Sequence, residues 1–224
     1  GRSTTTTTTY DVLSNVLTVT EPAVTNPISG VTHQKVTTNA YDLNSNLSTV
    51  TVSDAVGGDT SRVTHYSYDA DDRQVTTTDA EGGVTSRVFD ANGNVVQVTD
   101  PLGRVITTTY DDADHPVDVV MVGYTNPASN AAPRDITMSH TTYDLLGRVS
   151  SVTDAAGTVT TMTYDSRGNT TDVKVNGFVP LSGAPYDFVL SHKEYDSANR
   201  LAAEESGNGV ARVEYSYDAD GRRV

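Results

Sequence analysis

The dipeptide Tyr-Asp recurs along this chain at a nearly fixed spacing, and this repetition constrains the fold more than any other feature. Successive pairs are separated by about 21 residues or by a lengthened version of that interval. A period of this size is typical of structures in which one small unit is stacked many times. We therefore predict a single repeat array over residues 1–224, with units that start at residues 10, 41, 68, 89, 110, 143, 164, 195 and 217.

Each unit carries a turn signal at a constant offset from its aromatic residue, which we call position zero. Position four is always a turn-forming residue, and Asp at position one can accept hydrogen bonds from backbone N–H groups two residues further on. Glycine at position four permits the positive φ that tight hairpins need. The residues at position four are Ser14, Ser45, Asp72, Gly93, Asp114, Gly147, Gly168, Asn199 and Gly221.

The predicted functional residues are structural positions of the repeat, and no catalytic, cofactor or metal residue is predicted. They are the aromatic-Asp pairs and the glycines at position four, namely Tyr10, Asp11, Tyr41, Asp42, Tyr68, Asp69, Phe89, Asp90, Gly93, Tyr110, Asp111, Tyr143, Asp144, Gly147, Tyr164, Asp165, Gly168, Tyr195, Asp196, Tyr217, Asp218 and Gly221.

The segments between the turns are rich in Thr and Val, which are β-branched and favour strands. The short units contain a second turn signal, as at 79–82, 100–103 and 154–157. Two turns in 21 residues leave two strands per unit, so each unit is predicted to be a β-hairpin. One hairpin cannot bury its own apolar face, so neighbouring hairpins must pair. The predicted fold is all-β: tandem hairpins that form a curled antiparallel sheet.

Three units are lengthened by Pro-containing insertions. Two of them, Thr25-Asn26-Pro27-Ile28-Ser29 and Thr125-Asn126-Pro127-Ala128-Ser129, lie at the same offset from their Tyr, and the third is Val179-Pro180-Leu181-Ser182-Gly183. Proline cannot donate to a sheet ladder. We expect these insertions to be loops or hairpin tips at one edge of the sheet.

Charge and composition exclude several classes of function. The net charge is −14, which repels phosphate backbones and anionic lipid head groups, so neither nucleic acid nor membrane is expected as a partner. The chain has no Cys, so it has no disulfide and no thiolate chemistry. The common catalytic motifs of hydrolases, metalloproteases and nucleotide-binding enzymes do not occur. We predict that the chain is not an enzyme and binds no cofactor.

The repeat pattern resembles the YD-repeat, or Rhs, family. The resemblance is carried by segments such as Tyr143-Asp144-Leu145-Leu146-Gly147-Arg148 and Phe89-Asp90-Ala91-Asn92-Gly93-Asn94. It implies a strand ribbon wound into a hollow shell, as in bacterial Rhs proteins, insecticidal toxin complexes and teneurins. In the bacterial toxins of this family the shell encloses a C-terminal effector.

The resemblance therefore implies a structural scaffold: an open fragment of the shell of a large secreted or surface-exposed protein. Its partners would be the remaining repeats of the parent shell and an enclosed effector domain. The alternative is an adhesive module that binds carbohydrate or protein, because clustered Tyr residues on an acidic β surface suit stacking against sugars.

Two groups of residues allow a second interpretation. His65, His140 and His192 each lie three residues before a repeat Tyr, which fits either a metal-binding or pH-sensing ladder or ordinary strand positions. Asp90 and Asp218 begin segments that look like half of a calcium loop, but glycine follows at the wrong position and the bidentate Glu is missing. In both cases the structural interpretation is favoured.

Overall fold

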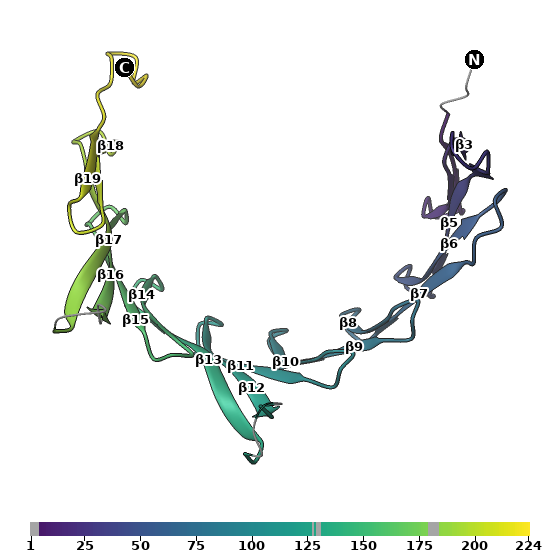
Figure 1. Cartoon of the computed structure of the whole chain (residues 1–224), viewed down its shortest axis with the longest axis horizontal. Helices are drawn as coiled ribbons and strands as arrows, with labels where there is room; N and C mark the ends of the chain where they lie inside the picture. Colours follow the sequence, from purple (N-terminus) through teal and green to yellow (C-terminus); the bar gives the residue numbers. More distant parts are fainter. Residues whose placement is uncertain (1–4, 127, 129–130, 179–183) are drawn as a thin grey trace. The chain divides into compact units, whose positions relative to one another are not determined.

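The computed structural model describes residues 5–126, 128, 131–178 and 184–224, and it shows strands and turns throughout. Within this part of the chain no helix is present, and hence none that is long and apolar enough to span a membrane. The strands follow one another as antiparallel hairpins (Figure 1). The all-β fold predicted from the repeats is confirmed. By their internal contacts, the residues form two compact parts. We call them the N-terminal part (residues 1–105) and the C-terminal part (residues 106–224), and keep the word unit for a single repeat.

The N-terminal part is a succession of hairpins in which each strand of the main sheet pairs with the next. Its main sheet contains β1 (Thr7–Tyr10), β2 (Val16–Thr20), β5 (Lys35–Tyr41), β6 (Leu47–Asp54), β7 (Arg62–Tyr68), β8 (Gln74–Thr78), β9 (Val84–Phe89) and β10 (Val95–Thr99). The pairings from β1 to β10 are antiparallel and join strands that are consecutive in this sheet. A separate two-stranded hairpin, β3 (Val24–Thr25) with β4 (Thr32–His33), is formed by the first lengthened unit.

The C-terminal part repeats this arrangement after β11 (Val105–Tyr110), whose first residue is the last of the N-terminal part. Its strands are β12 (Pro116–Tyr124), β13 (Arg134–Tyr143), β14 (Val149–Asp154), β15 (Val159–Tyr164), β16 (Thr170–Phe178), β17 (Tyr186–Tyr195), β18 (Leu201–Ser206) and β19 (Ala211–Glu214). From β12 to β19 each strand pairs antiparallel with its successor.

The register explains why the aromatic residue stands where it does. Tyr164 ends β15, pairs with Thr170 at position six of its own unit, and is preceded by a register shift. The same end-of-strand irregularity precedes Tyr10, Tyr41, Tyr68, Tyr143 and Tyr195. A four-residue turn with one extra residue in the left-handed region is a common way to close such a hairpin.

The turn residues adopt the backbone conformation that the sequence predicts. All nine residues at position four have positive φ, from 58° at Asp72 to 91° at Gly93. Gly82, Gly103 and Gly157, in the second turns, lie between 78° and 85°. Five of the nine position-four residues are Asp, Asn or Ser rather than Gly. Asp and Asn tolerate the left-handed region better than most side chains do.

The lengthened units extend the hairpins. Thr125 follows β12 directly, and β12 and β13 have 9 and 10 residues, compared with 6 in each of β14 and β15. In the N-terminal part, the insertion at residues 25–29 contributes to the turn between β3 and β4, where Gly30 N–H donates to Asn26 O. The first insertion therefore forms a hairpin tip, as predicted. Residues 127, 129 and 179–183, and with them the third insertion, lie outside the described residues.

The sheet is one layer thick, and its side chains are mostly half-buried. Ala203 is the only fully buried apolar residue in the described part of the chain. The chain of 23.8 kDa exposes 14450 Å². A globular protein of that mass would expose roughly 10,000 Å². The stabilising contacts are therefore those between neighbouring hairpins, and they lie at the repeat positions.

Candidate functional site

The Asp at position one closes the turn of its own unit. The Asp144 Oδ1 accepts hydrogen bonds from the backbone N–H groups of Leu146, at 2.9 Å, and Arg148, at 3.0 Å. Its Oδ2 accepts from the Arg148 guanidinium at 2.6–2.7 Å. The side-chain bond to Arg148, followed by its backbone bond, lowers the pKa of Asp144 below the usual value. This pattern satisfies turn donors that would otherwise depend on water.

The residue at position five connects this turn to the next unit. The Arg148 Cζ lies 4.2 Å from the ring centroid of Tyr164, the aromatic residue of the following unit. Arg73 lies over Phe89 at 4.8 Å and Arg200 lies over Tyr217 at 4.3 Å. Where position five is histidine, the ring takes the same place: His115 stacks on Tyr143 with 4.6 Å between centroids and 23° between planes.

The Tyr hydroxyl adds a second link between units. Tyr164 Oη donates to the backbone carbonyl of Val149, at position six of the preceding unit, at 2.8 Å. The same bond joins Tyr41 to Val16, Tyr68 to Leu47, Tyr143 to Pro116, Tyr195 to Thr170 and Tyr217 to Leu201, at 2.8 to 3.3 Å.

These two contacts form what we call the joint: positions one, five and six of one unit against position zero of the next. The predicted Asp and aromatic residues are connected through the position-five side chain: the Asp binds it, and it contacts the aromatic residue of the next unit where it is Arg73, His115, Arg148 or Arg200. Gly147 at position four lies in the joint as well, since a Cβ there would be 2.9 Å from the His115 ring. The sequence showed the period, but it did not show that the position-five side chain and the Tyr hydroxyl find partners in neighbouring units.

The histidines at position minus three lie opposite position eight of the preceding unit. His140 faces Asp118, with 2.6 Å between Nδ1 and Oδ1, and His192 faces Asp172, with 2.9 Å between the same atoms. His65 faces Thr49 instead. Position eight was the signal that could have found these carboxylates, because the insertions hide the pairing from any fixed sequence offset.

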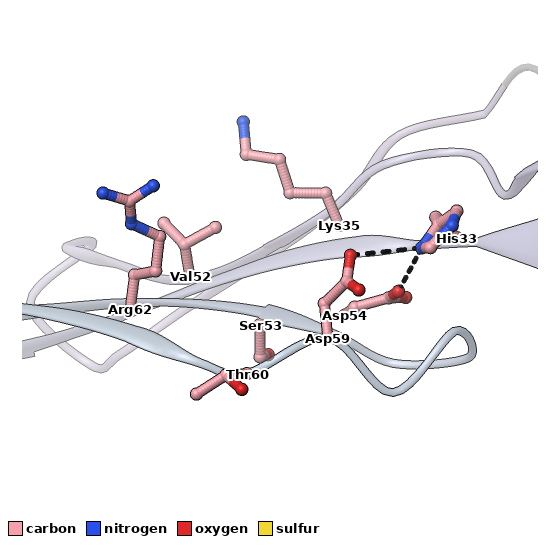
Figure 2. A pocket seen from close by; sticks show the side chains of 8 residues that line it. All are labelled: His33, Lys35, Val52, Ser53, Asp54, Asp59, Thr60 and Arg62. Atoms are coloured by element: carbon pink, nitrogen blue, oxygen red, sulfur yellow. Dashed lines mark hydrogen bonds and ion pairs between the residues drawn. The ribbon is translucent and has the colours of Figure 1, made fainter. Parts of the chain in front are cut away.

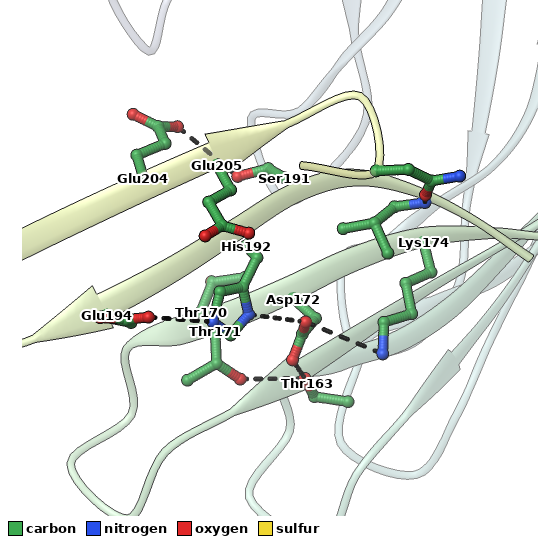
Figure 3. Close-up of polar contacts among 12 residues, drawn as sticks. Thr163, Thr170, Thr171, Asp172, Lys174, Ser191, His192, Glu194, Glu204 and Glu205 are labelled. Carbon is green, nitrogen blue, oxygen red and sulfur yellow. Dashed lines mark hydrogen bonds and ion pairs between the residues drawn. The ribbon is translucent and has the colours of Figure 1, made fainter. Parts of the chain in front are cut away.

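In the C-terminal part the His192–Asp172 pair belongs to a row that crosses neighbouring strands (Figure 3). Asp172 on β16 lies opposite His192 on β17, and His192 lies opposite Glu205 on β18. Burial alone would raise the pKa of Asp172, but the hydrogen bonds from His192 and Thr163 outweigh it and lower the pKa. Glu205 lies on the other side of His192 and contacts Arg212 at 2.5 Å. The row therefore places Asp172 beside His192 and Glu205 beside Arg212 as polar partners, which favours the pairing of its strands.

Another carboxylate–histidine group, formed by His33, Asp54 and Asp59, lies in the N-terminal part, and the sequence pattern did not predict it. The His33 Nδ1 is 2.6 Å from Asp54 Oδ2 and 3.3 Å from Asp59 Oδ2 (Figure 2). The hydrogen bond to Asp54 is the main reason that the pKa of His33 is raised. The three side chains border an open pocket of about 200 Å³. Because the insertion brings His33 to the sheet, no local spacing predicts this group.

The two half-calcium loops follow the pattern of the other turns. The Asp90 Oδ1 accepts from the N–H groups of Asn92 and Asn94, and the Asp218 Oδ1 accepts from those of Asp220 and Arg222. These carboxylate oxygens are therefore used inside their own turns, as the structural interpretation expects.

Comparisons with known proteins agree with this geometry. A family model described as RHS Repeat matches residues 89–128 and 143–177. No curated protein matches the chain. Among solved structures, the Tc holotoxin pore of Photorhabdus luminescens is similar with a TM-score of 0.61 and 14% identity over 97% of this chain.

A second similar structure is the crystal structure of TcdB2-TccC3 without its hypervariable C-terminal region, with 14% identity over 98% of this chain and a TM-score of 0.45. The present chain spans 13% and 14% of the lengths of these two chains, respectively.

The likeness to the holotoxin chain shows a shared fold, and the matched segments contain the same Tyr-Asp turns and joints as the rest of the array. On these grounds residues 89–128 and 143–177 match the RHS repeat family, and the chain shares the fold of the holotoxin chain to which it is similar.

Proposed function

We propose that this chain is a structural part of the wall of a YD-repeat shell, in a large secreted bacterial toxin-type protein, and that the shell encloses and presents a C-terminal effector. The observation that carries this proposal is the single layer of half-buried strands, in which Ala203 alone among the described residues is fully buried. A domain that acts alone buries one core between two layers. A single layer suits a wall, because links between neighbouring units along the sheet, rather than a buried core, would hold it together.

The joints supply those links. They tie neighbouring units by a hydroxyl–carbonyl bond, by an aromatic–guanidinium contact, or by both, as between Tyr164 and the unit of Arg148. Repeats that contact only their neighbours can be added without limit, as in other repeat proteins. In this proposal the further repeats and the effector are the partners, and the geometry of the joint continues around the shell.

Protease protection in the full-length protein tests this function. The region after the repeats should survive a protease dose that digests the same region expressed alone. Gly147→Val, which places a β-branched residue at positive φ, should weaken the wall and shorten the protection, whereas Thr158→Val in an exposed turn should not. Equal digestion of the enclosed and the isolated regions would contradict encapsulation.

A second function, adhesion to carbohydrate or protein, is favoured by one local feature. At the outer part of the β16–β17 hairpin, Phe178, Tyr186 and Phe188 have ring centroids 5.5 to 6.4 Å apart. Phe178 and Tyr186 are 40% and 42% exposed. Exposed aromatic faces can stack on sugars or act as anchors in protein interfaces. A glycan array with the wild-type chain and the Tyr186→Ser variant would detect such binding; identical signals would exclude this trio as its site.

A further inference from the structure

We propose that His33, Asp54 and Asp59 form a binding site for a divalent first-row transition-metal ion, represented by Zn²⁺. The site would connect the projecting β3–β4 hairpin to the sheet, because His33 lies on β4, Asp54 ends β6 and Asp59 lies in the loop that follows. This inference does not depend on the proposed shell function.

The ligand atoms are already together. One nitrogen of His33 and one oxygen from each carboxylate lie within 4.8 Å of one another. In Figure 2 both carboxylates point toward the imidazole, and a dashed line joins each of them to His33. Zinc is commonly bound by imidazole and carboxylate ligands at about 2.0–2.2 Å in a tetrahedron that water can complete. Ligand atoms at such a centre are roughly 3.4 Å apart, so a small widening of the 2.6 Å contact between His33 and Asp54 would admit the ion.

Asp54 is held in place by the backbone. Its Oδ1 accepts hydrogen bonds from the N–H groups of Gln34, Val56 and Gly57 at 2.8 to 3.1 Å, and its side chain is only 8% exposed. Those three bonds use one oxygen and direct the other, Oδ2, toward His33. Outer hydrogen bonds that fix a ligand in this way are typical of metal sites.

Gly57 keeps the space beside the ligands open. A Cβ on this residue would lie 2.3 Å from Asp54 Oδ2 and 2.4 Å from His33 Nδ1, closer than any side chain can approach. Any other residue at position 57 would therefore push these two ligand atoms apart. This observation is independent of the three side chains, and it also points to the same place.

The two cations that border the pocket are engaged elsewhere. Lys35 Nζ is 2.8 Å from Glu21, and an Arg62 nitrogen is 2.6 Å from Glu81. In Figure 2 both side chains extend away from His33. They do not neutralise the two carboxylates of the site, and an ion would bind the His33 imidazole by displacing any proton from its ligating nitrogen.

The donor set decides the class of ion. Calcium and magnesium prefer oxygen ligands only, and calcium takes six to eight of them. An imidazole nitrogen favours zinc, copper or nickel instead. The proposal therefore predicts that Zn²⁺ binds here and that Ca²⁺ does not compete with it at similar concentration.

Isothermal titration of the tag-free, chelator-treated chain with ZnCl₂ tests the site. The wild type should bind one ion at a site that Asp59→Asn and His33→Asn each weaken by at least tenfold. Asp59 is 72% exposed, so its replacement is not expected to disturb folding, and circular dichroism would verify this. His65→Asn is the matched control, because this histidine also lies in the N-terminal part but faces Thr49 rather than a carboxylate.

A second measurement follows the same ion without calorimetry. Zn²⁺ should shift the NMR resonances of the His33 ring before those of the other histidines, and Gly57→Ala should abolish the shift. Equal affinity of the wild type, Asp59→Asn and His33→Asn would overturn the proposal. So would displacement of Zn²⁺ by an equal concentration of Ca²⁺, which would indicate general attraction of cations to an acidic surface.

Discussion

Arg148 carries its guanidinium over the ring of Tyr164 at 4.2 Å, so the side chain that closes one turn also supports the aromatic residue of the next unit. The motif is thus a device for joining units as well as for making turns. If so, its energy should be found in pairs of residues rather than in single residues.

A double-mutant cycle measures the Arg148–Tyr164 contact. Arg148→Ala and Tyr164→Leu should each destabilise the chain, and the pair should lose less than the sum. For a partly exposed cation–π contact the coupling should be about 0.5–1 kcal/mol. Urea unfolding of the four proteins gives the value. Additive effects within error would show that the guanidinium interacts with Asp144 alone.

The hydroxyl of Tyr164 can be tested separately from its ring. Tyr164→Phe removes the bond to Val149 O and leaves that carbonyl without its partner, which should cost about 0.5–1.5 kcal/mol. Tyr66→Phe is the control, because the Tyr66 hydroxyl makes no hydrogen bond within the described part of the chain. Thermal melts of both variants decide; an equal loss would mean that the hydroxyl bond adds nothing.

Two glycines at position four separate backbone strain from crowding. Gly93→Ala meets only the positive φ of 91°, since no atom lies within 4 Å of its new Cβ. Gly147→Ala meets φ of 75° and also a Cβ placed 2.9 Å from the His115 ring. Strain alone should cost about 1–3 kcal/mol, and Gly147→Ala should exceed it. Urea midpoints that rank the two variants in the opposite order would contradict the joint at Tyr143.

Acid should weaken the array through the turn carboxylates. The Asp144 pKa is lowered in the folded chain by Arg148, and those of Asp69 and Asp196 are lowered by their position-five Arg residues, through the side chain of Arg73 and the backbone N–H of Arg200 first. A lowered folded pKa adds stability above the unfolded pKa, near 3.9, and this contribution is lost as the pH falls through the folded value. Unfolding free energy should therefore decline below about pH 4, and Asp144→Asn should reduce the slope. A flat profile to pH 2 would rule out this linkage.

The sequence predicted the repeats, the strands and the turn conformations, because each depends on residues within one unit. Positive φ at Ser14 or Asn199 followed from its place in the period. The partners of the repeated side chains depend on pairing between units, and the insertions change the sequence separation of the paired residues. His33 could not be assigned for this reason: it lies two residues before Lys35, which pairs with Asp54 across β5 and β6.

The hydroxyl bond at the joint has the same form across very different lengths of chain. Tyr164 reaches back 15 residues to Val149 and Tyr143 reaches back 27 residues to Pro116, both at 2.8 Å. The stretch between the two bonded groups can therefore lengthen without any change at the contact. Such an architecture separates what must stay constant from what can diversify: new loops can be acquired at the hairpin tips while the ribbon that carries them is left intact.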